Sequence, residues 1–300
     1  MSSSRRWIDI ALAWYFVSVW GSGFIATKAG IQYAAPFTFL ALRFALGVAL
    51  MIPLALILRP RWPTREEWPH VLVVGFLIHA FHLSGSHYAQ YLGLSAGVTA
   101  VIMALQTVIT AFIAAQWLGE PLSRLQWLGV VLGLAGVGLV VWHKIDVHVM
   151  TAGSLIAILC GLAGMTAGTL YQRRFCPQVD LYGAALIQFA LSLTILTPLA
   201  FAVEGAEVKW AWQLVAAIGF LVIFASILAV NALHTLMRHG EATRVTSMIY
   251  LTPIFAVVLE YVLFDVVPTA ISVAGIGITC AGVALVAFKR RKPPEDATAA

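Results

Sequence analysis

The chain has 300 residues, of which 61% are hydrophobic and only 10% are charged, and its formal net charge is +5. Soluble domains carry about 25% charged residues, so this chain has too few charges to cover one or two soluble domains. In such an apolar chain the positive balance concerns membrane orientation, and no nucleic-acid partner is expected. The composition predicts an all-α integral membrane protein that contacts the lipid bilayer.

Ten apolar runs are long enough to cross a bilayer, because a spanning helix needs about 20 mostly apolar residues. They cover residues 8–29, 35–58, 70–92, 95–118, 125–142, 151–172, 181–203, 211–236, 244–264 and 270–288. The breaks between them carry turn and charge signals, such as RPRWPTREEWP at 59–69. We therefore expect ten transmembrane helices.

Lys and Arg are spread unevenly over the segments that connect these runs. With the N-terminus in the cytoplasm, two lysines, Lys144 and Lys209, lie outside, and fourteen basic residues lie inside. The inner set is Arg5, Arg6, Arg59, Arg61, Arg65, Arg124, Arg173, Arg174, Arg238, Arg244, Lys289, Arg290, Arg291 and Lys292. Because cytoplasmic loops are enriched in Lys and Arg, both termini are predicted to face the cytoplasm from a multi-pass position in a cytoplasmic (inner) membrane.

The two halves of the chain resemble each other. FALGVALMIPLA at 44–55 matches FALSLTILTPLA at 189–200, at an offset of 145 positions. We predict two five-helix repeats, residues 1–146 and residues 147–300 with a basic tail, which form one transmembrane domain. An odd number of spans inverts the second repeat relative to the first, and inverted repeats are typical of secondary transporters with a midplane site.

The stretch WGSGFIATKAG at 20–30 contains the pattern G-x-G-x-x-A, which in other proteins holds a dinucleotide. That fingerprint needs a preceding strand and an acidic residue about 20 positions further on. Here a run of helix length precedes it, and no Asp or Glu occurs between Asp9 and Glu66. We interpret the stretch as membrane helix whose small residues permit close contact or local unwinding beside a cavity. No cofactor is expected.

Several motifs together resemble the ten-helix EamA-type members of the drug/metabolite transporter superfamily. They are Trp20-Gly21-Ser22-x-Phe24 with Lys28, then Pro36 and Arg43, LGEPL at 118–122, IYLTPIFA at 249–256, and the glycine pattern of the fifth and tenth runs. The resemblance covers about 8–288 and implies a basket of inverted repeats that carries small metabolites, often as an exporter. Within this group the chain is most similar to the YddG-type exporters of aromatic amino acids.

The third run, HAFHLSGSHYAQY at 79–91, is the most polar. His79, His82, Ser86 and Gln90 are spaced i, i+3, i+7 and i+11, which places them on one helix face. Polar groups that face lipid are costly, so this face should point into the bundle. Similar depth arguments select Gln106, Met165, Thr166, Ser226, Asn231, Tyr250 and Thr252, to which Trp20 and Met103 would add aromatic and thioether surface. We expect these side chains to line a substrate cavity; the alternative is ordinary packing and interhelical hydrogen bonding.

A few charged residues within the apolar runs are candidates for substrate capture or gating. Lys28 and Arg43 lie in the outer halves of their helices and could bind a carboxylate or line an exit. Alternatively, Lys28 extends to the membrane interface and Arg43 forms a structural ion pair, for which Glu260 is the candidate partner. The full set of gating and charge candidates is Lys28, Arg43, Glu120, Pro253 and Glu260.

Glycines in the fifth and tenth runs follow the small-residue spacing of helix packing. The predicted packing residues are Gly129, Gly133, Gly136, Gly275 and Gly282. A dimer interface is the alternative use of this spacing, so we expect a monomer or a weak homodimer.

These features predict a secondary transporter of small amphipathic metabolites, an amino acid (aromatic or neutral) or a drug, that works by alternating access and is not an enzyme. Two alternatives stay open. An intramembrane metalloenzyme could use His79, His82 and His87, although no acidic residue lies near the midplane and no metal is expected. A passive channel is the other. Coupling is predicted either to be absent, as in a facilitator, or to use protons carried by His79 or His82.

Overall fold

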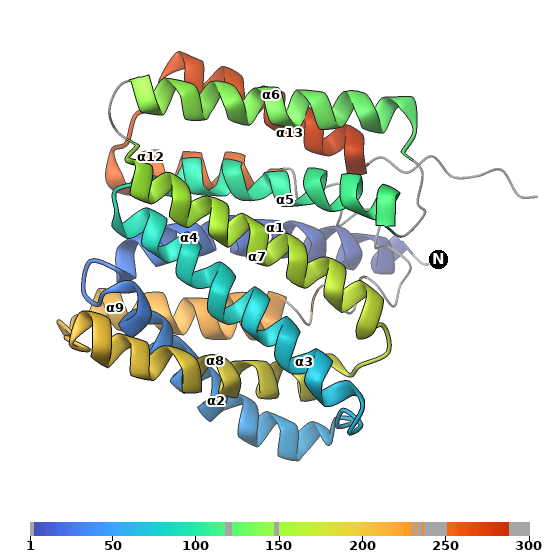
Figure 1. The fold of residues 1–300 in the computed structure, drawn as a ribbon, viewed down its shortest axis with the longest axis vertical. Helices are drawn as coiled ribbons and strands as arrows, with labels where there is room; N and C mark the ends of the chain where they lie inside the picture. The colour runs from blue at the N-terminus through green and yellow to red at the C-terminus, as the bar shows by residue number, and fades with distance from the viewer. Residues whose placement is uncertain are drawn as a thin grey trace, which may run out of the picture.

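The computed structural model describes residues 3–117, 122–146, 150–229, 232, 236 and 251–287, which form helices lying roughly side by side (Figure 1). Within these residues, seven segments have the length and hydropathy of a membrane span: Ile10–Gly30, Pro36–Leu58, Glu67–Tyr91, Ala96–Trp117, Arg124–His143, Ala152–Phe175 and Leu181–Glu204. Three apolar helices are shorter within the described residues: Trp212–Leu228, Thr252–Phe264 and Ala270–Val286.

The helix bounds lie close to the apolar runs. The helices are α1 (Ser3–Gly30), α2 (Pro36–Leu58), α3 (Glu67–Gly75), η1 (Phe76–Phe81), α4 (His82–Tyr91), α5 (Ala96–Trp117), α6 (Arg124–Asp146), α7 (Ala152–Phe175), α8 (Leu181–Glu204), α9 (Trp212–Gly219), η2 (Phe220–Leu228), α12 (Thr252–Phe264) and α13 (Ala270–Ala287). The third run is therefore three consecutive segments, and the eighth is at least two. The start of the ninth run lies outside the described residues.

Local sequence sets several helix ends. Pro36 occupies the start of α2, where its missing N–H costs no helical hydrogen bond. Thr151 and Ser154 form a reciprocal capping box at the start of α7. The Asp180 side chain accepts two backbone N–H groups at the start of α8, and Gly205 ends that helix with a left-handed φ of 67°.

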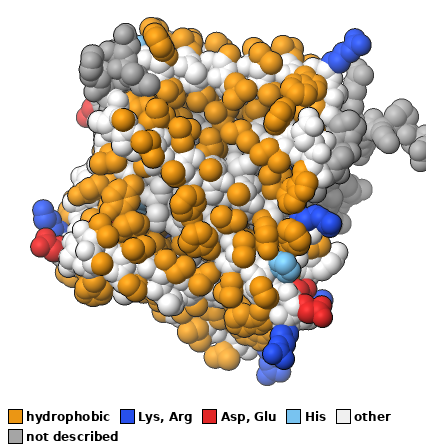
Figure 2. All heavy atoms as spheres, viewed as in Figure 1, with side chains coloured by type: hydrophobic (Ala, Val, Ile, Leu, Met, Phe, Trp, Pro, Cys, Tyr) orange, Lys and Arg blue, Asp and Glu red, His pale blue; other side chains and the backbone are white. Residues whose placement is uncertain are grey.

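The surface is apolar between two charged ends. In Figure 2 hydrophobic side chains cover the middle of the visible face, and the coloured charged side chains lie toward its left and right edges. Large apolar side chains such as Leu56, Ile57 and Phe201 are exposed by 73%, 77% and 67%. A band of this kind is suited to contact with lipid, because hydrocarbon imposes no penalty on exposed apolar groups.

The two halves pack against each other reciprocally. Helix α2 packs on α8, and α6 packs on α13, and in each pair the second helix begins 145 or 146 residues after the first. Helix α1 packs against α9, η2 and α12 of the second half, whereas α7 packs against α3, η1, α4 and α5 of the first. This exchange is the packing that two units related by a two-fold axis would produce.

Each half also contains a π-helix at a corresponding position. η1 follows α3 in the first half and η2 follows α9 in the second, and their first residues, Phe76 and Phe220, are 144 positions apart. A π-helix is rare and frequently lies at a functional site. The sequence periodicity predicts neither segment.

Glycines let α6 and α13 approach at backbone distance. A Cβ atom on Gly129 would lie 2.6 Å from the Gly282 carbonyl oxygen, and one on Gly136 would lie 2.7 Å from that of Gly275. A Cβ atom on Gly282 would lie 2.3 Å from the Gly133 nitrogen. All five predicted packing glycines therefore lie along a contact within one chain.

Candidate functional site

Arg43 lies on α2 and points toward the π-helix of the other half. Its Nη2 atom donates to Ser226 Oγ of η2 at 3.4 Å, and the Ser226 hydroxyl donates in turn to the Leu221 carbonyl oxygen at 2.9 Å. The Phe44 ring centre is 6.0 Å from the guanidinium carbon. Among the described residues no Asp or Glu forms an ion pair with Arg43.

Gln188 occupies the position on α8 that corresponds to Arg43, 145 residues later. Its Oε1 atom accepts a hydrogen bond from His79 Nε2 of η1 at 3.1 Å. A Cβ atom on Gly75 would lie 2.9 Å from Gln188 Cγ, so glycine is needed to admit this side chain. Equivalent positions of α2 and α8 thus each face a polar residue of a π-helix, one as a cation and the other as a neutral amide.

Two phenylalanine rings connect these polar pairs. The Phe44 and Phe189 ring centres are 5.3 Å apart, and His79 stands edge-on to both, at 6.0 and 5.1 Å. We name Arg43, Ser226, His79, Gln188, Phe44 and Phe189 the central cluster. Arg43, His79 and Ser226 are partly exposed, whereas the Phe44 and Phe189 rings are buried. The central cluster combines a permanent cation, neutral hydrogen-bonding groups and two aromatic rings.

The polar residues of the third run, which regular helical spacing places on one helix face, contact different neighbouring helices. His79 contacts α8, whereas His82 Nδ1 donates to the Gly161 carbonyl oxygen of α7 at 3.0 Å. The π-helix that ends at Phe81 changes the number of residues per turn, and the i, i+3 relation of a regular α-helix does not hold across it. Ser86 is buried on α4, and Gln90 is buried with neither amide atom hydrogen bonded to the described residues.

His87, the third histidine of the metalloenzyme alternative, is buried 3.4 Å from the Thr27 hydroxyl of α1, measured from Nε2. Over the described ranges, no group of three or more His, Cys, Asp or Glu side chains is arranged to hold a metal ion.

The remaining cavity candidates are dispersed. Met103 is 8% exposed within the largest apolar cluster, against which Met165 also packs. Gln106 donates to the hydroxyls of Thr110 and Thr169. Trp20 is 38% exposed and stacks on Phe16.

Thr252 and Pro253 are buried at the start of α12, and a Cβ atom on Gly21 of α1 would lie 3.0 Å from the Thr252 carbonyl oxygen. Asn231, Tyr250 and Glu120 lie outside the described residues.

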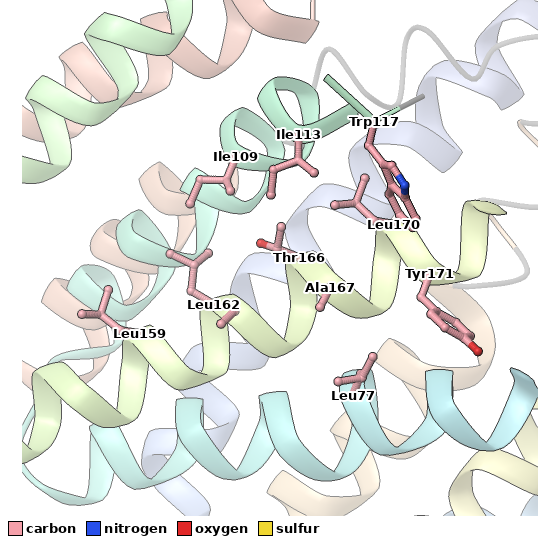
Figure 3. A pocket seen from close by; sticks show the side chains of 11 residues that line it. Leu77, Ile109, Ile113, Trp117, Leu159, Leu162, Thr166, Ala167, Leu170 and Tyr171 are labelled. Atoms are coloured by element: carbon pink, nitrogen blue, oxygen red, sulfur yellow. The ribbon is translucent and has the colours of Figure 1, made fainter. Parts of the chain in front are cut away.

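An apolar cavity of about 610 Å³ lies between η1, α5 and α7 (Figure 3). Its lining is Leu77, Ile109, Ile113, Trp117, Leu159, Leu162, Ala163, Thr166, Ala167, Leu170 and Tyr171. Of the predicted cavity residues that the structure describes, only Thr166 borders it, so this cavity and the central cluster are separate features.

A carboxylate from α12 joins the start of α5 to α1. Glu260 Oε1 lies 2.6 Å from Lys28 Nζ and accepts from Ala96 N, while Oε2 accepts from Gly97 N at 2.8 Å. The ion pair with Glu260 that was one alternative for Arg43 is not formed, because Glu260 pairs with Lys28. Lys28 therefore has a protein partner, and its side chain is 23% exposed.

A second carboxylate, which the sequence analysis did not select, caps α2. Glu204 accepts from the backbone N–H groups of Phe37 and Thr38, from the Thr38 hydroxyl and from the Tyr88 hydroxyl. Its position at the end of an apolar run gave the appearance of a loop residue. We name Glu204 and Glu260 the two carboxylate caps; they hold the starts of α2 and α5, toward the left of Figure 1.

Comparison with known proteins places these features in a family context. The sequence matches the EamA-like transporter family over residues 7–142 and again over 152–288. It is 25% identical to "Uncharacterized transporter YvbV" of Bacillus subtilis, over 92% of this chain and 90% of that one. It is 24% identical to "Uncharacterized inner membrane transporter YedA" of Escherichia coli, over 80% and 78% of the two chains. One solved crystal structure shares the fold, with a TM-score of 0.66 at 17% identity over 95% of this chain and 98% of its own.

Proposed function

The chain belongs to the EamA-like transporter family, and on this basis we propose that it is a secondary transporter that exports small amphipathic metabolites from the cytoplasm. Amino acids, aromatic or neutral, are the substrate class that we favour, as in YddG-type exporters, with drugs as the broader possibility. The multi-pass helical fold supplies the lipid-embedded scaffold.

The central cluster is the observation that carries this proposal. It brings polar side chains from α2, η1, α8 and η2 to the contact between the two halves. His79 stands near the middle of the Glu67–Tyr91 span, so the central cluster falls near the midplane if that span crosses the membrane. Transporters built from paired repeats bind substrate at such a position.

Alternating access requires at least one end of the bundle to open. The two carboxylate caps fix α8 to α2 and α12 to both α5 and α1. We propose that this end is the outer one and that it is closed in the structure. Substrate release to the outside would then require the helices joined by the caps to separate.

We propose that transport is driven in one of two ways, by the substrate gradient alone or by exchange with protons. A facilitator would move substrate down its own gradient, whereas a proton exchanger would use His79 or His82. Transport into proteoliposomes with an imposed pH gradient and no substrate gradient distinguishes them. Accumulation that survives replacement of both histidines would contradict both routes.

The function itself is tested by reconstitution. Purified protein in liposomes, supplied with a panel of labelled amino acids, should show saturable uptake and counterflow, in which unlabelled substrate on one side accelerates entry of label from the other. Protein-free liposomes are the control. Uptake without saturation or counterflow would favour a passive channel, and no movement of any panel compound would remove the transporter proposal.

A further inference from the structure

Arg43 is the charged member of the central cluster, and no carboxylate of the described residues forms an ion pair with it. Its guanidinium is always protonated and offers five N–H donors in a planar fork. One contact is visible, to Ser226 Oγ at 3.4 Å, which is long for a hydrogen bond. A charge within an apolar helix is costly unless a polar or anionic partner compensates it.

The carboxylates that reach between the helices of the described chain are occupied. Glu260 binds Lys28 and two N–H groups of α5. Glu204 binds the start of α2 and the Tyr88 hydroxyl. Neither can neutralise Arg43 without losing these contacts, so an anion at Arg43 has to come from outside this set. A planar carboxylate matches the fork of a guanidinium with two parallel hydrogen bonds.

The neighbours of Arg43 determine what can be attached to that carboxylate. Phe44 lies beside the guanidinium, and Phe189 lies 5.3 Å from Phe44 between ring centres. Phe189 is held in place because Gly47 leaves just enough room for its ring: a Cβ atom there would lie 2.9 Å from Phe189 Cδ2. Both rings are buried in the structure, so an aromatic or branched apolar group would pack on them once the helices around the central cluster separate.

The same neighbourhood offers little to an ammonium group. Gln188 and Ser226 are neutral, and the His79 ring already donates to the Gln188 amide oxygen. Within the described part of the chain, no carboxylate contacts any polar member of the central cluster. An amino group on the substrate would therefore gain no ion pair to offset the loss of its hydration.

Resting on the proposed transport function, we infer that the central cluster selects an amphipathic organic monocarboxylate, with its carboxylate on Arg43 and its apolar part on Phe44 and Phe189. The α-amino group of an amino acid is then tolerated but not required. This assigns the substrate class more narrowly than amino acid export does, because a deaminated acid is accepted and an amino-acid amide is rejected.

Four probes with the same ring separate the contribution of the carboxylate from that of the amino group. They are phenylalanine, hydrocinnamate (the acid without the amino group), phenylalaninamide and hydrocinnamamide. Each is measured by the shift in thermal unfolding of the purified protein in detergent, and by competition against uptake of labelled phenylalanine or hydrocinnamate in proteoliposomes. We expect both acids to bind within a few-fold of each other, and both amides to bind at least about tenfold more weakly, because a charge-assisted contact is lost.

Variants assign the preference to Arg43. Arg43→Gln should reduce acid binding to the level of the amides, and Arg43→Lys should keep part of the preference, because it retains charge but loses the fork. Arg61→Gln, in the exposed α2–α3 connection with 64% side-chain exposure, is the matched control and should change nothing.

Each failure has a distinct meaning. If wild-type protein binds amides as tightly as acids, or requires the amino group, the inference is overturned while transport stands. Acid preference that persists in a folded Arg43→Gln protein also overturns it. If acids stabilise the protein through Arg43 but no compound crosses the liposome membrane, the transport proposal fails and the assignment of the site stands. Should Arg43→Gln not fold, the probe comparison in wild-type and Arg43→Lys protein still decides.

Discussion

Replacing Glu260 by Gln tests whether this carboxylate cap stabilises the bundle through its charge. The carboxylate accepts three hydrogen bonds, from Lys28 Nζ, Ala96 N and Gly97 N, with side-chain exposures of 23% for Lys28 and 4% for Glu260. A glutamine offers one acceptor oxygen, which at the Oε1 position still accepts from Ala96 N, while its NH2 group faces Gly97 N and loses that bond. Because the amide is uncharged, the ion pair with Lys28 is lost as well.

The expected magnitudes follow from counting these contacts. At about 1.5 kcal/mol per charge-assisted hydrogen bond, Glu260→Gln should cost about 3 kcal/mol of unfolding free energy, and Lys28→Met about 1.5 kcal/mol. The double variant loses the same two contacts as Glu260→Gln and should also cost about 3 kcal/mol. The singles therefore exceed the double by about 1.5 kcal/mol, which is the coupling energy of the pair.

The assay is equilibrium unfolding in mixed micelles at increasing mole fractions of SDS, followed by far-ultraviolet circular dichroism. Glu204→Gln combined with Lys28→Met is the matched control: Glu204 also caps a helix but does not contact Lys28, so its cycle should be additive within about 0.5 kcal/mol. Additivity of the Lys28 and Glu260 variants would refute the reasoning, because it would show that the 2.6 Å contact contributes nothing to stability.

Three further predictions concern topology, the central cluster and helix packing. A cysteine replacing Lys209 should react with an impermeant reagent added outside cells, whereas one replacing Arg61 should not; external labelling at Arg61 would reverse the orientation. His79→Leu should express normally but lower transport about fivefold or more, since it leaves buried Gln188 without its donor; unchanged uptake would assign His79 to packing. Gly282→Val should lower the free energy of unfolding by at least about 1–3 kcal/mol, measured by thermal unfolding, because its Cβ atom would lie 2.3 Å from a backbone nitrogen of α6. Gly277→Val is the control and should cost little, because a Cβ atom there meets open space; equal effects would contradict the close approach of α6 and α13.

Periodicity and loop composition predicted the positions of the helices because both are local properties of the sequence. Helices α2 and α8 begin and end within a residue of the corresponding apolar runs, and α5 begins within a residue of its run. The π-helices were not predicted, since one additional residue in a turn leaves no compositional mark. The expected common face of His79 and His82 assumed the roughly 3.6 residues per turn of an α-helix. The π-helix that contains His79 has more residues per turn.

The sequence allowed us to predict some of the residues of the candidate site, but not which residues they contact. Sequence offset alone made Arg43 and Gln188 counterparts, but which group each one meets depends on how the halves exchange helices. Lys28 and Glu260 are 232 residues apart, and no local rule distinguishes Lys28 from Arg43 as the partner. Glu204 was missed for a related reason: a carboxylate that caps a helix far away in sequence looks like an ordinary loop acid.

The paired π-helices bear on the ancestry of the chain. A π-helix can arise when one residue is inserted into an α-helix. An insertion that follows a gene duplication is found in one repeat, whereas an insertion that precedes the duplication is inherited by both repeats at matching positions. η1 and η2 begin 144 residues apart, close to the spacing of the two stretches that match the family. A single insertion before the gene duplication accounts for both π-helices. Relatives that contain a single such stretch should then carry the widened turn in their third helix as well.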